Sequence, residues 1–226
     1  MSGGVLIFDM DGVLVDVGES YREAICQTVG HFTGRPITRE QVQAYKNHGG
    51  WNNDWALSQK IAADLGVTVP YETVIAHFQR LFLGNGDDGL ILRERWLPGH
   101  ELLERLAIRY QLAVFTGRPR AEAGLTLRRF GVEEVFSPVI GADDVVRGKP
   151  APDGLLRIGE LCPGSRLWYV GDTVDDLRSA RAAGVPFIGV AAAGSHRRDE
   201  LVDRFTAEGA IAVVENVNQL PEALER

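Results

Sequence analysis

The sequence predicts an α/β protein, in which a parallel sheet is covered by helices and interrupted by an all-helical insertion. From residue 111 onward, short β-branched runs alternate with segments of helical periodicity. Strands alternating with helices indicate parallel pairing, because a parallel strand cannot return through a tight turn. Residues 16–92 show helical patterns and little strand-like alternation. These observations favour one sheet domain with a separate helical part.

The expected strands are short apolar runs, each bounded by turn-forming residues. They are VLIFD at 5–9, LAVFT at 112–116, FSPVIG at 136–141, LWYVG at 167–171, PFIGVA at 186–191 and IAVVEN at 211–216. Helices are expected between them at 101–110, 121–130, 154–162 and 175–184. The domain boundaries are therefore discontinuous, with residues 1–15 and 93–226 forming the sheet domain.

The insertion, residues 16–92, is expected to contain four helices. Gly, Pro and Asn signals separate them at 20–32, 38–46, 53–66 and 71–83. A glycine-rich loop follows, in which Gly84, Gly86 and Gly89 match the spacing of a dinucleotide-binding loop. That site needs a preceding strand and an immediately following helix, so a flexible hinge is the favoured interpretation.

Composition restricts the classes of function. The chain has 226 residues, of which 45% are hydrophobic and 24% charged, with a formal net charge of -7. No row of Lys and Arg exists to neutralise successive phosphates, which argues against nucleic acid as a partner. The first apolar run carries Asp9 and has no basic region before it, so it is not typical of a signal peptide. No run reaches the roughly 20 apolar residues of a membrane span. We therefore expect a cytoplasmic protein that does not bind membranes.

Two carboxylates, Asp9 and Asp11, stand where the first strand is expected to end. One residue separates them, so in an extended segment they point to the same face. In open parallel sheets, ligands bind beyond the carboxyl ends of the strands. Two anions 4 Å apart repel by about 4 kcal/mol at an effective dielectric constant near 20, which favours a bound divalent cation. The alternative is that Asp11 merely begins an Asp-Gly turn.

Three further segments place polar residues at the same expected edge. Thr116 and the Gly117 N–H follow one strand and could bind an anionic oxygen. Asp172 follows another strand, and Asp175 and Asp176 come in the first turn of the next helix. Lys149 lies in the loop GKPAPDG. Each has a simpler interpretation as a strand-end hydroxyl, a helix cap or a solvated lysine, but together they indicate a site.

The segments DMDGVLVD, FTG, GKPAPD and VGDTVDD, in this order, resemble the haloacid dehalogenase-like superfamily of phosphohydrolases. The resemblance covers the whole sheet domain and implies a Rossmann-like fold with residues from about 16 to 92 as a helical cap. It implies that Asp9 is the nucleophile and Asp11 the general acid and base. It further implies that Thr116 and Gly117 hold phosphate oxygens, and that Lys149 offsets negative charge.

The same resemblance implies a Mg²⁺ site. Asp9, the backbone carbonyl of Asp11, and Asp172 would bind the ion, with Asp176 in support, while Asp175 fills a variable position of the family pattern. Oxygen ligands select Mg²⁺ over softer metals. Asp11 also separates this sequence from the dehalogenases of the superfamily, which lack that second aspartate.

Selectivity for the substrate is expected to reside in the polar and aromatic segment YKNHGGWNNDW. Its candidate residues are Lys46, His48, Trp51 and Asn52. The alternative is that Trp51 and Trp55 are core partners four residues apart on one helix. Arg118 and Arg120 could touch an anionic substrate, although solvated arginines at a helix start are the favoured interpretation.

The function that these residues predict is a Mg²⁺-dependent phosphatase acting on a small phosphorylated metabolite. A sugar-phosphate mutase of the same superfamily would use the same residues and differ in how well the closed cap excludes water. A catalytically silent binding protein on this fold is the third hypothesis. The complete set of Asp9, Asp11, Thr116, Lys149 and Asp172 argues against it.

Overall fold

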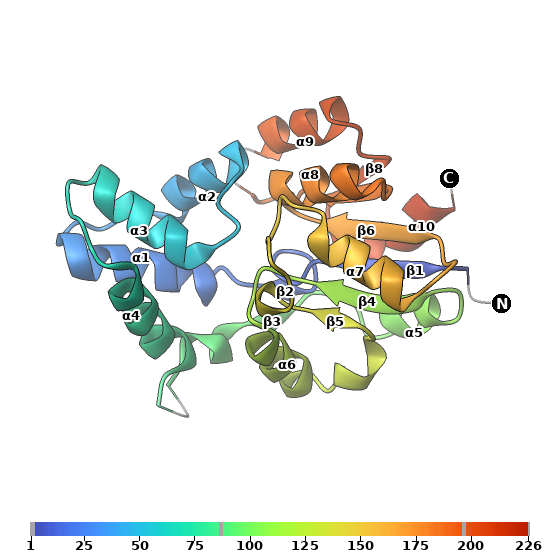
Figure 1. Cartoon of the computed structure of the whole chain (residues 1–226), viewed down its shortest axis with the longest axis horizontal. Helices are drawn as coiled ribbons and strands as arrows, with labels where there is room; N and C mark the ends of the chain where they lie inside the picture. The colour runs from blue at the N-terminus through green and yellow to red at the C-terminus, as the bar shows by residue number, and fades with distance from the viewer. Residues whose placement is uncertain (1–2, 86–87, 196–197, 226) are drawn as a thin grey trace. The chain divides into compact units, whose positions relative to one another are not determined.

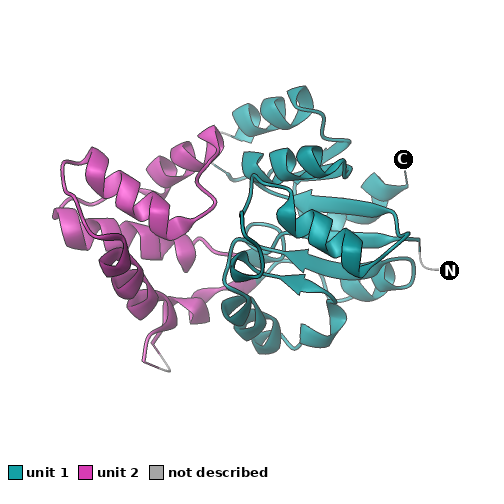
Figure 2. Cartoon of the chain, viewed as in Figure 1, with its two compact units in different colours: residues 1–15, 96–226 teal, residues 16–95 magenta. Residues whose placement is uncertain are grey.

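The computed structural model describes residues 3–85, 88–195 and 198–225. Its contacts divide the chain into two compact units, Met1–Val15 with Trp96–Arg226 and Asp16–Arg95 (Figure 2). The division falls three residues beyond the boundary expected at 92/93. The two chain segments that connect the units, β2 (Val15–Asp16) and β3 (Arg95–Trp96), pair as a two-stranded sheet.

The first unit contains a six-stranded parallel sheet in the order β5-β4-β1-β6-β7-β8. The strands are β1 (Val5–Phe8), β4 (Gln111–Phe115), β5 (Val139–Ile140), β6 (Leu167–Gly171), β7 (Phe187–Val190) and β8 (Ala212–Val214). All four residues of β1 are fully buried, as expected for a central parallel strand covered on both faces. This confirms the predicted α/β class.

Helices cover both faces of this sheet (Figure 1). They are α5 (Leu102–Ala107), α6 (Arg120–Arg129), α7 (Asp153–Leu161), α8 (Val174–Ala183), α9 (Arg198–Ala207) and α10 (Leu220–Leu224). Apolar side chains of α7, α8 and α9 form one core with alternate residues of β1, β4, β6 and β7. Figure 1 shows α5 and α10 behind the sheet, where they contact β4 and β8. The sequence patterns did not predict α9 and α10, which carry fewer apolar residues at helical spacing.

The described residues of the second unit form four α-helices and a short 3₁₀ turn. They are α1 (Tyr21–Thr33), α2 (Arg39–His48), α3 (Asp54–Asp64), α4 (Tyr71–Leu83) and η1 (Leu90–Arg93). Tyr21, Phe78 and Phe82 pack together between α1 and α4. Gly84 ends α4 and Gly89 precedes η1, so a helix rather than a strand leads into the glycine-rich loop. Gly86, the middle glycine, lies outside the described residues.

Candidate active site

Strand β1 lies between β4 and β6 in the sheet, and the candidate site is formed by residues that follow these three strands. Asp9 follows β1, Thr116 follows β4 and Asp172 follows β6. The Asp9 N–H donates to the carbonyl of Val170 at 2.8 Å, so the chain is still aligned with β6 at this point. Three adjacent parallel strands therefore end side by side and bring these residues to one edge of the sheet.

Lys149 joins this edge through a fully buried ammonium group. Its Nζ donates to Oδ1 of Asp9 at 2.8 Å, to Oδ1 of Asp176 at 2.7 Å and to the Tyr169 hydroxyl at 3.0 Å. The ammonium has the three donors that these contacts require. The structure thus rules out a solvated lysine at this position, because the side chain has no exposed surface.

Burial and charge shift the pKa values of this network in different directions. Burial raises the pKa of Asp9 well above its ordinary value, and the nearby carboxylates add to that effect against the opposing effect of Lys149. Burial alone would lower the pKa of Lys149, but Asp176 and Asp9 together raise it. Burial likewise opposes ionisation of Asp176, yet Lys149 and donated hydrogen bonds hold its pKa below the ordinary value. The surroundings of Lys149 therefore favour its charged form, whereas those of Asp9 favour its protonated form relative to a free aspartate.

Asp176 accepts four hydrogen bonds. Its Oδ1 accepts from Lys149 and, at 2.6 Å, from the Tyr169 hydroxyl. Its Oδ2 accepts from the Thr173 N–H at 3.0 Å and from the Thr173 hydroxyl at 2.5 Å, in a capping box at the start of α8. Four donors leave this carboxylate in one orientation, so Asp176 serves to hold Lys149 in place.

The sequence patterns did not single out Tyr169. It lies on β6 beside Ile7 and Phe115 in an apolar run, and its ring is fully buried. A buried tyrosine hydroxyl needs a hydrogen-bond partner, and Lys149 and Asp176 supply it. Burial and the neighbouring carboxylates raise its pKa well above the ordinary value, so the hydroxyl stays neutral.

The edge also has the donor set of a hard divalent cation. Asp9, Asp172 and Asp176 each offer a carboxylate oxygen, and these atoms lie within 4.8 Å of one another. A Cβ on Gly12, whose φ is +75°, would lie 2.0 Å from Oδ2 of Asp172. Glycine at this turn therefore allows the backbone after Asp11 to approach Asp172 closely.

Charge gives the same indication of a cation. Four carboxylates, those of Asp9, Asp11, Asp172 and Asp176, gather at this edge, where Lys149 pairs with Asp9 and Asp176, and Arg118 pairs with Asp11. Carboxylates brought this close repel one another, and a bound divalent cation reduces that repulsion. The residues present therefore fit a divalent cation, and Asp175, although buried in the first turn of α8, is not part of this ligand group.

The interpretation of Arg118 as a solvated arginine is wrong. Its side chain is 1% exposed, and its Nε donates to Oδ1 of Asp11 at 2.6 Å. Its Nη1 donates to the Thr126 hydroxyl at 2.8 Å, so two guanidinium nitrogens have acceptors within the protein. Arg120 does lie at the surface, where its side chain is 60% exposed and pairs with Asp144.

Thr116 and Gly117 lie where the predicted anion-binding turn should be. The Thr116 side chain is buried, and its hydroxyl accepts from the Arg118 N–H at 3.2 Å. Gly117 is partly exposed. α6 starts three residues after Gly117, with Pro119 at its N-cap.

The candidate selectivity residues belong to the second unit. Lys46 lies on α2 and forms an ion pair with Asp54 at 2.7 Å, with both side chains mostly buried. His48 is exposed at the end of α2, and its Nδ1 lies 2.7 Å from the carbonyl of Ala44. Trp51 and Asn52 follow in the partly exposed connection to α3.

The alternative that pairs Trp51 with Trp55 on one helix is wrong. Helix α3 starts at Asp54, after Trp51. Trp51 instead makes an edge contact with Tyr45 of α2, with ring centroids 6.4 Å apart.

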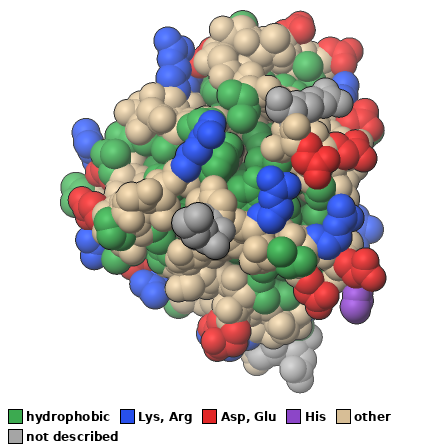
Figure 3. All heavy atoms as spheres, turned by 90° about the vertical axis from the view of Figure 1, so that its right-hand side faces the viewer, with side chains coloured by type: hydrophobic (Ala, Val, Ile, Leu, Met, Phe, Trp, Pro, Cys, Tyr) green, Lys and Arg blue, Asp and Glu red, His purple; other side chains and the backbone are tan. Residues whose placement is uncertain are grey.

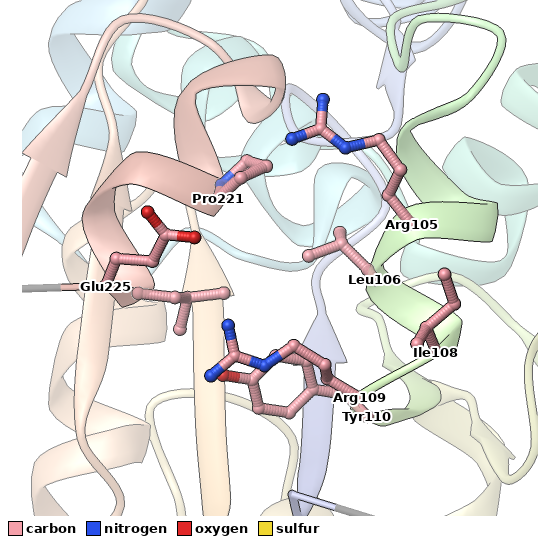
Figure 4. A pocket seen from close by; sticks show the side chains of 8 residues that line it. Arg105, Leu106, Ile108, Arg109, Tyr110, Pro221 and Glu225 are labelled. Carbon is pink, nitrogen blue, oxygen red and sulfur yellow. The ribbon is translucent and has the colours of Figure 1, made fainter.

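A pocket of about 240 Å³ lies at the opposite, amino edge of the sheet (Figure 4). It is formed by α5, the segment between α5 and β4, and α10, and Arg105, Arg109 and Glu225 contribute its charges. Figure 3 shows the molecule from the side of the chain termini, where basic and acidic side chains are interspersed. Because ligands of open parallel sheets bind at the carboxyl edge, this pocket does not define the active site.

The fold and the edge geometry define a class of α/β enzymes whose reacting groups follow adjacent parallel strands. The profile of one such family, haloacid dehalogenase-like hydrolase, matches residues 4–184. The chain belongs to this family.

Three curated relatives illustrate the similarity. The chain is 37% identical over 197 residues to an imidazoleglycerol-phosphate dehydratase of Phytophthora nicotianae, covering 82% of this chain and 42% of that protein. It thus spans less than half the length of that relative. It is 32% identical to the Dickeya dadantii protein named probable phosphatase IndB, covering 87% and 84% of the two chains. It is 26% identical to a phosphoglycolate phosphatase of Cereibacter sphaeroides, covering 80% and 82%.

Solved structures share the fold at low sequence identity. A haloacid dehalogenase-like hydrolase from Bacteroides fragilis matches 97% of this chain and all of its own, with a TM-score of 0.77 and 20% identity. A protein named as a β-phosphoglucomutase from Thermotoga maritima matches 100% and 99% of the two chains, with a TM-score of 0.68 and 24% identity. Among the described residues, no helix combines the length and the apolar character that crossing a membrane requires.

Proposed function

We propose that this protein is a Mg²⁺-dependent phosphatase that hydrolyses a small phosphate monoester through an aspartyl-phosphate intermediate. The observation that carries the proposal is Asp9, a buried carboxylate fixed by Lys149 at the carboxyl edge of the sheet. Asp11 and Asp172 flank it on the chain and on the neighbouring strand. Relatives named as phosphatases support the same reaction class.

The roles of the residues follow from what their atoms can do. Oδ1 of Asp9 accepts from Lys149, which leaves Oδ2 to attack phosphorus while the ester P–O bond breaks. Asp11 gives a proton to the leaving oxygen and then takes one from the water that attacks the aspartyl phosphate. That second step forms inorganic phosphate and restores the Asp9 carboxylate. Thr116 and Gly117 donate to phosphate oxygens.

Asp9, Asp172 and the backbone carbonyl of Asp11 would hold Mg²⁺, with Asp176 fixing Lys149 beside them. The ion supplies the positive charge that offsets repulsion between the nucleophile and the phosphate. Lys149 contributes further positive charge through its hydrogen bond to Oδ1 of Asp9.

The substrate class is a small phosphorylated metabolite, and the names of the relatives suggest which to test. We would measure released phosphate from a panel of sugar phosphates, aminoalkyl phosphates, 2-phosphoglycolate and imidazoleglycerol phosphate. Hydrolysis of one ester well above the others supports the proposal. No phosphate from any ester, nor from an aryl phosphate, would favour the silent binding protein.

The mutase alternative keeps the same first step and differs in the acceptor. Phosphorus NMR with a sugar phosphate distinguishes the two reactions, because a mutase moves the phosphoryl group to another hydroxyl and a phosphatase forms inorganic phosphate.

We expect Mg²⁺ to raise the thermal stability of the wild-type protein by several degrees. The carboxylates of Asp9, Asp172 and Asp176 could hold the ion, and a ligand at 100 times its Kd stabilises the folded state by about 2.7 kcal/mol. Ca²⁺ should also raise the Tm but not support turnover, because its looser coordination shell misplaces the nucleophile. Differential scanning fluorimetry and phosphate release measure the two effects.

Asp172→Asn provides the matched variant, since it keeps the shape and removes one anionic ligand. Its Tm should respond much less to Mg²⁺, and its turnover should need more of the ion. Full turnover of the wild-type protein in excess chelator would contradict the metal role.

We expect alanine substitutions at Lys46, His48, Trp51 or Asn52 to lower kcat/KM for the physiological ester and spare a small aryl phosphate. If this segment recognises the leaving group, it contributes through contacts to remote parts of the substrate. Steady-state kinetics with both esters measure the difference. A parallel loss of both activities together with a lower Tm would show that these residues only stabilise the helical unit.

A further inference from the structure

Arg118 contacts Asp11 in a way that constrains the carboxylate. The two residues are 107 positions apart, and Nε of Arg118 donates to Oδ1 of Asp11 at 2.6 Å. Asp11 itself is 28% exposed, whereas the Arg118 side chain is 1% exposed. The arginine therefore lies beneath the carboxylate on the protein side and leaves its outer part accessible.

The arginine is itself held in place. Its Nη1 donates to the Thr126 hydroxyl on α6 at 2.8 Å. Its own N–H donates to the Thr116 hydroxyl at 3.2 Å, and its carbonyl accepts from the Ala142 N–H at 2.8 Å. A planar guanidinium fixed at both ends has little freedom to reach a substrate.

We propose that Arg118 is a positioning residue that holds the Asp11 carboxylate in the orientation for proton transfer. This rests on the proposed function, in which Asp11 protonates the leaving oxygen and later deprotonates water. A charge-assisted hydrogen bond to Oδ1 restricts rotation of the carboxylate and leaves Oδ2 to carry the proton. In this proposal Arg118 acts on Asp11 rather than on the substrate.

The leaving group supplies a specific test of this role. An alkoxide needs a proton as the P–O bond breaks, whereas a nitrophenolate leaves readily without one. The ratio kcat/KM reports steps up to the first phosphoryl transfer. Removing Arg118 should therefore lower kcat/KM strongly for an alkyl phosphate and little for p-nitrophenyl phosphate.

Hydrolysis of the aspartyl phosphate needs Asp11 as a base whatever ester formed it. For p-nitrophenyl phosphate, loss of positioning should therefore lower kcat while kcat/KM stays nearly unchanged. Phosphoenzyme should accumulate and appear as a burst of about one nitrophenolate per active site.

The experiment compares four variants on the two esters. Arg118→Met removes the guanidinium. Arg118→Lys keeps the positive charge but loses the planar group with several N–H donors. Thr126→Val removes the hydroxyl that accepts from Nη1 of Arg118 and leaves Asp11 unchanged. Arg120→Met, an exposed arginine two residues away, is the matched control. We expect about a 100-fold loss of kcat/KM on the alkyl ester for Arg118→Met, about tenfold for Thr126→Val, an intermediate loss for Arg118→Lys and none for Arg120→Met. On the aryl ester, kcat/KM should change less than about threefold.

Equal losses of kcat/KM on both esters without a burst, or full activity of Arg118→Met, would overturn the positioning role. If Arg118→Met does not fold, Thr126→Val and Arg118→Lys carry the same comparison. Wild-type protein that hydrolyses neither ester would overturn the proposed function and this inference together. Wild-type activity without leaving-group selectivity in the variants would overturn only the inference.

Discussion

Asp9→Asn is expected to abolish turnover, with a loss of at least about 10⁴-fold, because an amide cannot attack phosphorus. The substitution also removes an anionic ligand of the proposed ion. Single-turnover assays with an aryl phosphate at saturating Mg²⁺ measure the loss. Activity near that of the wild-type protein would exclude Asp9 as the nucleophile and with it the mechanism.

The same variant should be more stable than the wild-type protein in the absence of metal. Burial raises the pKa of Asp9, so the folded state binds this proton more tightly than the unfolded chain does. Ionisation of Asp9 therefore reduces folding stability as the pH rises above about 4, the value of an unperturbed aspartate. The Tm advantage of the amide should be present near pH 7 and shrink toward pH 4. A lower Tm than wild type at pH 7 would contradict this account.

Lys149→Met should destabilise the protein by about 3–5 kcal/mol and also abolish turnover. The ammonium contacts Asp9 and Asp176, and removing one partner of a buried ion pair leaves uncompensated charge. In a domain of this size, 1 kcal/mol shifts the Tm by about 2–4 °C, so the fall should be about 6–20 °C. Thermal unfolding in chelator measures it.

Arg147→Met is the matched control, since Arg147 is two residues away, exposed and paired with Asp153. An exposed ion pair contributes little to stability, so its Tm should change by no more than about 2 °C. Equal changes in the two variants would show that burial does not determine the contribution of Lys149.

Much of the fold could be predicted from the sequence, because buried parallel strands appear as short apolar runs. LWYVG matches β6 residue for residue, and VLIFD exceeds β1 by one residue. Each of the four helices of the second unit overlaps its predicted segment, with α1 ending one residue and α2 two residues beyond it. α9 was missed because its first turn is charged and only Leu201 and Phe205 are buried. Strand order could not be predicted, since nothing in the apolar pattern states which strands are neighbours.

The candidate site could also be predicted in part, because the apolar runs show where each strand ends. Residues that follow strands, such as Asp9, Thr116 and Asp172, could be placed at one edge without knowing the strand order. The contact of Tyr169 with Lys149 depends on that order, and the contact of Arg118 with Asp11 joins loops 107 residues apart. The roles that the family resemblance implies stay predictions until the variants are measured.

The position of β1 in the sheet has a consequence for biosynthesis. Of the six strands of this sheet, β1 is synthesised first although it lies in the middle of the sheet, and its partners β4 and β6 lie more than 100 residues later in the chain. Residues 16–95, by contrast, form one uninterrupted segment with its own core. We therefore expect the helical unit to fold cotranslationally before β4 and β6 are synthesised. During that time β1 has no partner strands, and its apolar residues stay exposed. Nascent chains stalled before residue 111 should then bind chaperones through residues 5–8, and those extended beyond residue 171 should not.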